Sequence, residues 1–418
     1  MIIFKFGGAS VKNAQSVKNI AGIIRQAPGP LIAVVSAMGK TTNRLETILE
    51  KGINNSGEYK ELMEELILDH LDLISKLIPD PTHPLFEEVR FLFLQAANML
   101  KTYEGKEYNF IYDQVVSVGE LVSTKIVSTW LEYSGISNHW VDIRQILKTD
   151  SSYREAIVNH EISASLCRNM FQASNPPCFI TQGFIGSDMK NHTTTLGREG
   201  SDYTAALLAD YLDAENVTLW KDVDGIFNAD PARFSNVRKI DTMDYQEVIE
   251  LTYYGAKVIH PKTIRPLFEK RIPLFVKNFN APEKSGTAVG KTGFSENRDS
   301  FIIVLENQLL ISVSKNDLSF ISELNLSYLF DLLHSFRLKA NLMQHSAVSF
   351  SFCVDTPKGK AVKELIVKLQ KEFKVLYNTN LLLITVRNYS PELIHELIGN
   401  KNVLVEQRSR QTVQFVIA

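Results

Sequence analysis

The chain has 418 residues, of which 44% are hydrophobic and 22% are charged, the usual mix of a soluble globular protein. Its formal net charge is −2 and it has no dense run of Lys or Arg, so the sequence predicts no nucleic-acid partner. Cys167, Cys178 and Cys353 lack metal-ligand spacing and are expected to be reduced thiols. No apolar run reaches the length of a membrane span, and the apolar start before Gly7 is too short for a signal peptide. We therefore expect a cytoplasmic protein without a membrane partner.

Strands alternate with helices through the first two thirds of the sequence. Residues 2–6 and 31–37 are predicted strands, and a helix near 16–26 separates them. This β-α-β order predicts a parallel sheet with helices on its faces. Further apolar patterns predict helices at 58–78, 84–104, 118–133 and 203–212, and strands at 138–143, 178–185, 216–220 and 273–277. The sequence thus predicts a three-layer α/β/α domain over residues 1–290.

The predicted elements become shorter after a turn and linker near residues 280–300. A strand, a helix, two strands, a helix and a strand follow, in the ferredoxin-like order, at 308–314, 321–336, 338–344, 347–354, 358–372 and 373–377. A shorter copy comes next, with a strand, a helix and two strands at 381–387, 391–398, 402–407 and 411–417. We predict one such domain at 300–378 and a truncated one at 379–418, with strand 301–305 as a candidate to complete the second.

The first motif with chemical content is Lys5-Phe6-Gly7-Gly8-Ala9-Ser10, at the end of the first predicted strand. Two glycines let the backbone approach a ligand closely, and their N–H groups can surround an anion. Lys5 would place a cation where charge develops during phosphate transfer. Taken alone, a Lys-x-Gly-Gly run is more often, by about three to one, a surface lysine before a tight turn.

The second motif runs from Val34 to Asn43 and again leads from a strand through small residues and hydroxyls to a helix start. Sheets of α/β proteins place their ligand sites at such strand ends. By itself the segment is also compatible with an ordinary loop and helix cap.

The third motif, residues 193–202, is the most specific of the local signals. It brings hydroxyls, two glycines and Arg198 directly before a predicted helix, and a guanidinium can hold a carboxylate through two parallel hydrogen bonds. Helix capping alone would account for Ser201 and Asp202, but not for an arginine between glycines.

The fourth motif, residues 219–231, is an acidic loop with a glycine after a strand. A calcium loop would need a third ligand, a glycine at its sixth position and a terminal glutamate, and the spacing here lacks them. A plain Asp-Gly turn is the commoner structure for such a segment.

In this order along one chain, eight segments resemble aspartate kinase, a branch of the amino-acid-kinase family. They are KFGGAS (5–10), VVSAMGKTTN (34–43), SVGE (117–120), GFIG (183–186), TTLGREGSDYTAALLA (194–209), LWKDVDGIFNADP (219–231), YGAKVIHP (254–261) and IPLFVKNF (272–279). The resemblance implies transfer of the γ-phosphate of ATP to the β-carboxylate of L-aspartate, the first step toward lysine, threonine and methionine. It implies Mg²⁺ carried by the nucleotide and no metal ligands from the protein.

The resemblance also assigns roles to individual positions. It implies that Lys5 stabilises the transferring phosphoryl group and that Asp202 orients Lys5. The residues that would hold aspartate are Thr42, Glu120, Arg198 and Ser201, with Arg198 on the α-carboxylate and Glu120 on the α-ammonium. The residues that would contact the nucleotide are Gly7, Gly8, Ser10, Lys221, Asp222, Phe227 and Lys257. Because the acceptor carboxylate is ionised near neutral pH, the reaction needs no catalytic base.

The sequence departs from the family pattern in both halves. Ala9 replaces a usual threonine, and Ala232 stands where the family has an arginine, which comes one place later as Arg233. The C-terminal part resembles paired ACT domains, which implies a homodimer formed through these domains and a feedback amino acid bound between them. The effector-loop segments at 315–320 and 345–347 differ from the family pattern, which weakens the expectation of feedback by lysine or threonine.

Two alternatives stay open at this stage. In the first alternative, the chain has the same fold but phosphorylates another amino acid, such as glutamate. Alternatively, it would be a regulatory subunit with ACT domains and little catalysis, for which Ala9 and Ala232 leave room.

Overall fold

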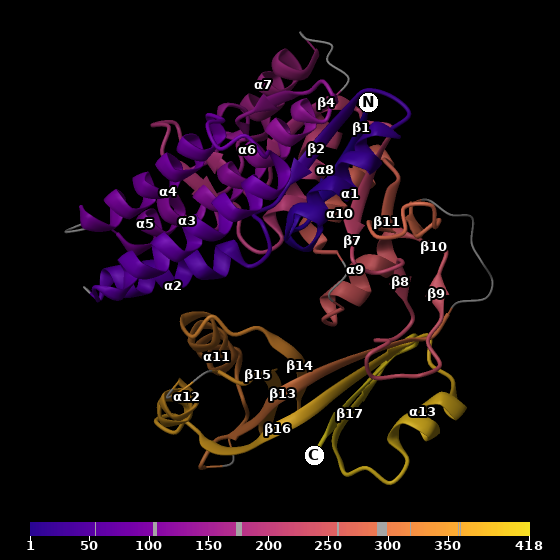
Figure 1. Ribbon diagram of the computed structural model, residues 1–418. Coiled ribbons are helices and arrows are strands. Elements are labelled where there is room, and N and C mark those ends of the chain that lie inside the picture. Colours follow the sequence, from indigo (N-terminus) through magenta and orange to yellow (C-terminus); the bar gives the residue numbers. More distant parts are fainter. Residues whose placement is uncertain are drawn as a thin grey trace. The chain divides into compact units, whose positions relative to one another are not determined.

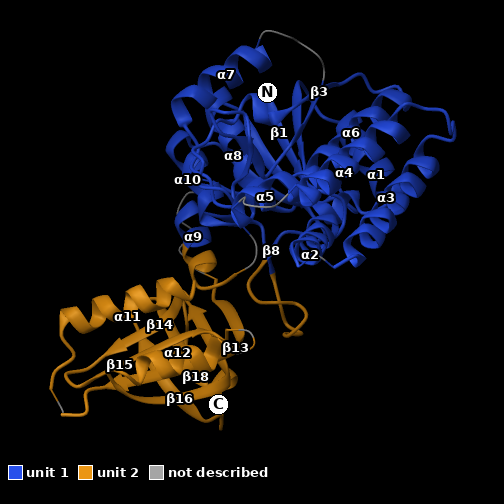
Figure 2. Ribbon diagram, turned by 90° about the vertical axis from the view of Figure 1, so that its left-hand side faces the viewer, with its two compact units in different colours: residues 1–226, 239–249, 258–293 blue, residues 227–238, 250–257, 294–418 orange. Residues whose placement is uncertain are grey.

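The computed structural model describes residues 1–54, 56–102, 107–172, 178–256, 259–290, 299–317, 319–357, 359 and 361–418. The chain divides into two compact units (Figure 2). The first comprises residues 1–226, 239–249 and 258–293, and the second comprises residues 227–238, 250–257 and 294–418. Among the described residues, no helix has the length and apolar character needed to cross a membrane.

The first unit is built on an eight-stranded sheet in the order β10-β12-β11-β7-β1-β2-β4-β3. Its strands are β1 (Ile2–Phe6), β2 (Leu31–Val35), β3 (His139–Val141), β4 (Cys178–Gln182), β7 (Asn216–Lys221), β10 (Thr242–Met243), β11 (Leu274–Asn278) and β12 (Thr287–Val289). Neighbouring strands are parallel except for β11 and β12. All five residues of β2 are buried, as expected for a strand with helices on both of its faces.

Helices cover both faces of this sheet (Figures 1 and 2). One face carries α1 (Ala14–Arg25) and α6 (Val118–Tyr133), and the other carries α7 (His160–Gln172), α8 (Gly200–Leu212) and α10 (Pro261–Lys270). Beyond the first of these layers lie α2 (Thr41–Ile53), α3 (Glu58–Leu77), α4 (Leu85–Lys101) and α5 (Tyr108–Val116). The unit therefore has the predicted three-layer α/β/α arrangement.

Shorter elements complete the description of this part of the chain. They are the 3-10 helices η1 (Gly8–Val11) and η2 (Ile143–Gln145), the paired strands β5 (Ile185–Ser187) and β6 (Thr193–Thr195), the paired strands β8 (Ile226–Phe227) and β9 (Lys239–Ile240), and helix α9 (Tyr245–Tyr253). The predicted strand 178–185 ends earlier, as β4, and the chain restarts as β5. Phe184 has a φ of 69°, so the chain turns out of the sheet there.

The second unit is a six-stranded antiparallel sheet in the order β14-β15-β13-β16-β18-β17. Its elements are β13 (Phe301–Ser314), α11 (Glu323–Ser335), β14 (Ala340–His345), β15 (Ser349–Asp355), α12 (Ala361–Leu369), β16 (Lys374–Arg387), α13 (Pro391–Ile398), β17 (Val403–Arg408) and β18 (Thr412–Ile417). Alternate residues of β13, such as Leu309, Ile311 and Val313, pack with α11 and α12. Residues of β16 and β18 pack with α13. These are two ferredoxin-like units, of which the second has one helix, as predicted.

Two long strands join these ferredoxin-like units, where the sequence predicted four short ones. β13 and β16 pair with each other along 301–305 with 383–387 and along 310–314 with 374–378. A register irregularity separates the two stretches, and Asn307 there has a φ of 53°. The polar residues around Asn307 and Asn380 interrupt the apolar pattern, which explains why the sequence predicted separate strands. The predicted linker residues 291–298 lie outside the described residues.

Phe352 tests the core of the second unit, because its side chain is fully buried beneath α11 and α12. We expect Phe352→Ala to destabilise this unit by about 3–5 kcal/mol, because it leaves a cavity that the surroundings fill only in part. Amide hydrogen exchange of β13 and β15 in the full chain measures the loss. Phe320→Ala is the control: Phe320 is 74% exposed, and its truncation should leave the exchange nearly unchanged. Equal exchange in the two variants would contradict the described core.

Candidate active site

Three charged side chains meet at the carboxyl ends of two central strands. Lys5 lies in β1 and Lys221 ends β7, which pairs directly with β1. The Lys5 Nζ lies 2.6 Å from Asp202 Oδ1, and the Lys221 Nζ lies 3.3 Å from Asp202 Oδ2. One carboxylate therefore holds two ammonium groups, and the three side chains together carry a net charge of +1.

The electrostatics of Asp202 follow from this arrangement. Its side chain is 3% exposed. Burial disfavours its ionised form, but attraction to Lys5 and then to Lys221 outweighs burial and lowers its pKa to about 2. Because this pKa lies below the usual value for Asp, the ion pairs stabilise the fold at neutral pH, and that stabilisation is lost only as the pH falls toward 2.

The Asp202 carboxylate belongs to the first turn of α8, whose N-terminus is held against another loop. A Cβ at Gly183 would lie 2.5 Å from the Ser201 Cβ, and a Cβ at Gly200 would lie 2.9 Å from the Phe184 ring. The loop before the helix also turns sharply, since Glu199 has a φ of 53°. Close backbone packing thus holds the positive end of the α8 dipole beside the two lysines.

The two glycine-containing loops after β1 and β2 are packed against each other. Gly39 N donates to Gly8 O at 3.0 Å. A Cβ at Gly8 would lie 2.8 Å from Gly39 O and 2.9 Å from Ala37 O, so only glycine fits there without a shift. Ser10 is buried, and its Oγ donates to Trp220 O at 3.3 Å, next to Lys221. The loops and the lysines therefore share the same edge of the sheet.

Glu120 is a buried carboxyl group in the first turn of α6, with 3% exposure. Burial raises its pKa to about 8, even though its own N–H and that of Ala37 donate to it. Its Oε2 has no hydrogen-bond partner among the described residues. A Cβ at Gly119 would lie 3.1 Å from Ala37 and 3.2 Å from Thr41, so α6 starts directly against the loop after β2.

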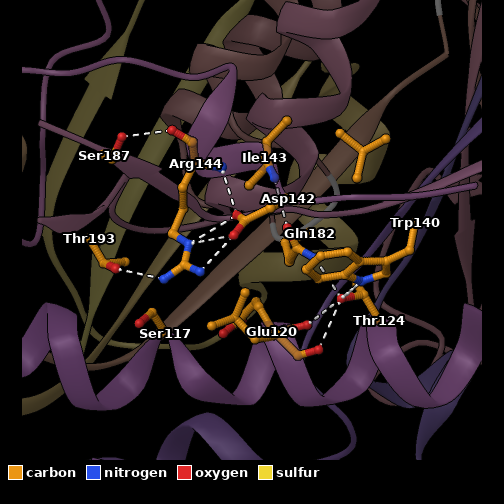
Figure 3. Close-up of polar contacts among 12 residues, drawn as sticks. Ser117, Glu120, Thr124, Trp140, Asp142, Ile143, Arg144, Gln182, Ser187 and Thr193 are labelled. Carbon is orange, nitrogen blue, oxygen red and sulfur yellow. Dashed lines mark hydrogen bonds and ion pairs between the residues drawn. The ribbon is translucent and has the colours of Figure 1, made fainter. Parts of the chain in front are cut away.

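A hydrogen-bond network supports the helix that carries Glu120, and Figure 3 shows it gathered around Thr124. The Thr124 Oγ1 donates to Glu120 O at 3.0 Å. It also accepts from the Gln182 Nε2 at 2.7 Å and from the Trp140 Nε1 at 3.0 Å. Gln182 ends β4 and is fully buried, so the network ties α6 to the sheet.

Arg198 and Asp202 are both near His260, the N-cap of α10. Burial lowers the pKa of His260. The charges of Glu199 and Asp202 act in the opposite direction, and the charge of Arg198 lowers this pKa further. The Arg198 side chain is exposed, at the end of the loop before α8. Arg198 lies four residues before Asp202, which binds Lys5. Arg198 and Lys5 therefore both lie at the N-terminal end of α8.

The remaining residues predicted from the sequence are placed as follows. Thr42 is half-buried in the first turn of α2, one residue after the Thr41 that approaches Gly119. Asp222 follows Lys221 and is exposed. Phe227 belongs to the second unit, and Lys257 lies outside the described residues.

Two features of the site escaped the sequence analysis. Lys221 was assigned to nucleotide contacts, yet it also pairs with Asp202. The signal was available, because a parallel pairing of strand 216–220 with the first strand would put both lysines at one edge. His260 was not singled out, since a histidine before a proline is typical of a helix start and carries no chemical signature.

Comparison with known proteins identifies the family of this chain. The model of the "Amino acid kinase family" matches residues 1–278. "Lysine-sensitive aspartokinase 3" of Escherichia coli (strain K12) is 33% identical over 365 residues, which cover 85% of this chain and 78% of the relative. The "Bifunctional aspartokinase/homoserine dehydrogenase 1, chloroplastic" of Zea mays is 31% identical over 307 residues, which cover 71% of this chain but only 33% of the relative.

Two solved structures of aspartokinase III from E. coli match the whole chain at 26% identity, and both have a TM-score of 0.83. One is in complex with lysine and aspartate, and this chain covers 95% of it. The other is in complex with aspartate and ADP, and this chain covers 96% of it. On the family match, the identity to E. coli aspartokinase 3 and the shared fold, the chain belongs to the amino acid kinase family, within its aspartokinase branch.

Proposed function

We propose that this protein is an aspartate kinase that transfers the γ-phosphate of ATP to the β-carboxylate of L-aspartate, giving 4-phospho-L-aspartate. The observation that carries this proposal is the arrangement of Lys5 and Lys221 on Asp202, beside two glycine-containing loops and the N-terminus of α8. Such a group of fixed positive charges matches a transferring phosphoryl group, whose charge must be neutralised and whose position must be held.

The residues at this edge of the sheet fit the polyphosphate of ATP. A side chain at Gly8 would meet the backbone of Ala37 and Gly39, so glycine lets the loops after β1 and β2 pack together beside the lysines. Lys5 and Lys221 together exceed the charge of Asp202, so a positive charge remains for the phosphates. We assign Gly7, Gly8 and Ser10 to the phosphate loop, and Asp222, Phe227 and Lys257 to further nucleotide contacts.

We propose that Mg²⁺ enters the site bound to the phosphates of ATP. Within the described residues, no group of three His, Cys, Asp or Glu side chains is arranged to hold a metal ion. Mg²⁺ commonly binds through substrate phosphates and few protein ligands, and bound there it would neutralise phosphate charge.

The aspartate substrate would bind through its ammonium and its α-carboxylate. Glu120 is buried and its Oε2 is left without a partner among the described residues, which suits an incoming ammonium group. Arg198 is exposed at the end of its loop and can hold the α-carboxylate through two hydrogen bonds. We place Ser201 and Thr42 beside the same substrate. The β-carboxylate is ionised near neutral pH and attacks without help from a base.

The second unit suggests assembly and regulation. We propose that residues 300–378 and 379–418 are ACT domains, with 301–305 completing the second, and that two copies of the chain form a homodimer through them. The pairing of 301–305 with 383–387 in one sheet supports this division. A feedback amino acid is proposed as their ligand, since the E. coli relative is named lysine-sensitive. We also propose a cytoplasmic location, which suits three buried free cysteines.

Lys5→Ala tests the proposed function directly. We expect the variant to lower kcat by roughly a hundredfold or more, because a preorganised charge that meets the transition state is lost. A coupled assay of ADP release with aspartate and ATP–Mg²⁺ measures it. Unchanged turnover would contradict the role assigned to Lys5. Lys60→Ala, at an exposed position of α3, is the matched control and should leave kcat unchanged.

The same assay separates the alternatives for the wild-type chain. Glutamate or another amino acid as the best acceptor would replace aspartate as the substrate on this fold. No turnover with any acceptor, together with tight amino-acid binding in calorimetry, would identify a regulatory subunit instead.

A further prediction concerns the proton that Glu120 should release when aspartate binds. With a pKa of about 8, this carboxyl group is mostly protonated at pH 7, and it must ionise to pair with an ammonium. Aspartate binding at pH 7 should therefore release close to one proton, and release should fall as the pH rises past 8. Calorimetry in buffers of different ionisation enthalpy, with ADP and Mg²⁺ present, measures the release. The Glu120→Gln variant should release none, and a wild-type enthalpy independent of buffer would contradict the assignment.

A further inference from the structure

Two consecutive side chains of α5 close the outer edge of strand β6. The Gln114 side chain accepts from Thr193 N at 3.2 Å and donates to Thr193 O at 2.8 Å. The Asp113 carboxylate accepts from Thr195 N at 2.8 Å and from the Thr195 Oγ1 at 2.8 Å. The inner edge of β6 pairs with β5, so α5 replaces the missing strand on the other side.

Asp113 also holds the neighbouring loop. Both of its oxygens accept from Arg154 N, at 3.1 and 3.0 Å, and Ala156 N donates to Thr195 O at 2.9 Å. The side chain is fully buried. Among the described residues, the donors that reach it are backbone N–H groups and a hydroxyl, and two of these four contacts are to Thr195. Asp113 is therefore a clamp on the carboxyl end of β6.

Asp113 and Thr195 each precede, along the chain, one of the two residues proposed to hold the substrate. Arg198 follows Thr195 by three residues, through Gly197 with its φ of 78°. Glu120 follows Asp113 by seven residues, in the first turn of the helix that comes directly after α5. The contact between Asp113 and Thr195 therefore ties the segment that leads to Arg198 to the segment that leads to Glu120.

We propose that Asp113 is a positioning residue, which sets the spacing of Glu120 and Arg198 and thereby the fit of the amino-acid backbone of the acceptor. The inference rests on the proposed function. Asp113 does not touch the reacting atoms. It acts through the loop that carries Arg198, so it governs the binding of the acceptor rather than the transfer step or the binding of nucleotide.

The β5–β6 hairpin offers a matched control at its opposite end. Asp188 is also buried, and its Oδ1 accepts from Lys190 N and from His192 N, both at 2.9 Å. Its Oδ2 accepts from the Ser151 and Tyr153 hydroxyls, both at 3.2 Å. It secures the turn between Ser187 and Thr193, away from the end that leads to Arg198. Both carboxylates contact the loop before Ala156, but only Asp113 binds Thr195, at the end of β6 that leads to Arg198.

Asp113→Asn is the first variant. The amide nitrogen that replaces one carboxylate oxygen can only donate, so it cannot accept the hydrogen bonds that this oxygen accepts in the wild type. We expect the KM for aspartate to rise by about tenfold or more, the scale of losing a hydrogen bond to a charged group. We expect kcat and the KM for ATP to stay within about threefold of the wild type, since neither depends on the spacing. Asp188→Asn should leave all three constants near their wild-type values.

Partial unfolding would not imitate this result, because an inactive fraction lowers the apparent kcat and leaves KM unchanged. If Asp113→Asn does not fold, Thr195→Val removes the hydroxyl contact alone and should raise the KM for aspartate in the same direction. The proposal is overturned if the KM for aspartate stays the same, or if Asp188→Asn raises it equally. A wild-type chain that does not phosphorylate aspartate would instead refute the proposed function, whatever the variants do.

Discussion

The site depends on one buried carboxylate that holds two ammonium groups. Without Asp202, Lys5 and Lys221 would repel each other at the ends of adjacent strands, and neither would keep a fixed position. With it, their attraction outweighs the penalty of burying a charge, and a surplus positive charge remains at the edge of the sheet. The rest of the site depends on this constraint, because it joins the first strand, the seventh strand and the N-terminus of α8.

We propose two kinds of ligand recognition at that edge. On one side lie glycine backbones, lysines and a helix N-terminus, a combination that suits phosphate. Glu120 is a buried carboxyl group at the start of α6, and Arg198 is an exposed cation before α8; we propose that they hold the two charged groups of an amino acid. Parallel strands make this possible, since their carboxyl ends all meet at one edge, whatever their separation in the sequence.

Much of this was predictable from the sequence, and the exceptions have physical reasons. The α/β order, the glycine loops and the ferredoxin-like pattern are local signals, so they were identified. The continuity of β13 and β16 was missed, because it depends on pairing across a polar interruption near Asn307. The pairing of Lys221 with Asp202 and the clamp by Asp113 are contacts between distant segments. They leave no local pattern: the position of Lys221 follows only from the pairing of its strand with the first strand, and the contacts of Asp113 appear only in the folded chain.

The coupling of Lys5 to Asp202 is the central claim, and a double-mutant cycle in kcat tests it most directly. The measurement compares Lys5→Ala, Asp202→Asn and the double variant in the same ADP-release assay. If Asp202 acts mainly by holding Lys5, the second substitution should cost little once the first is made, and the double variant should be close to the worse single variant. Losses that multiply independently would contradict the account, because the two side chains would then act as separate groups.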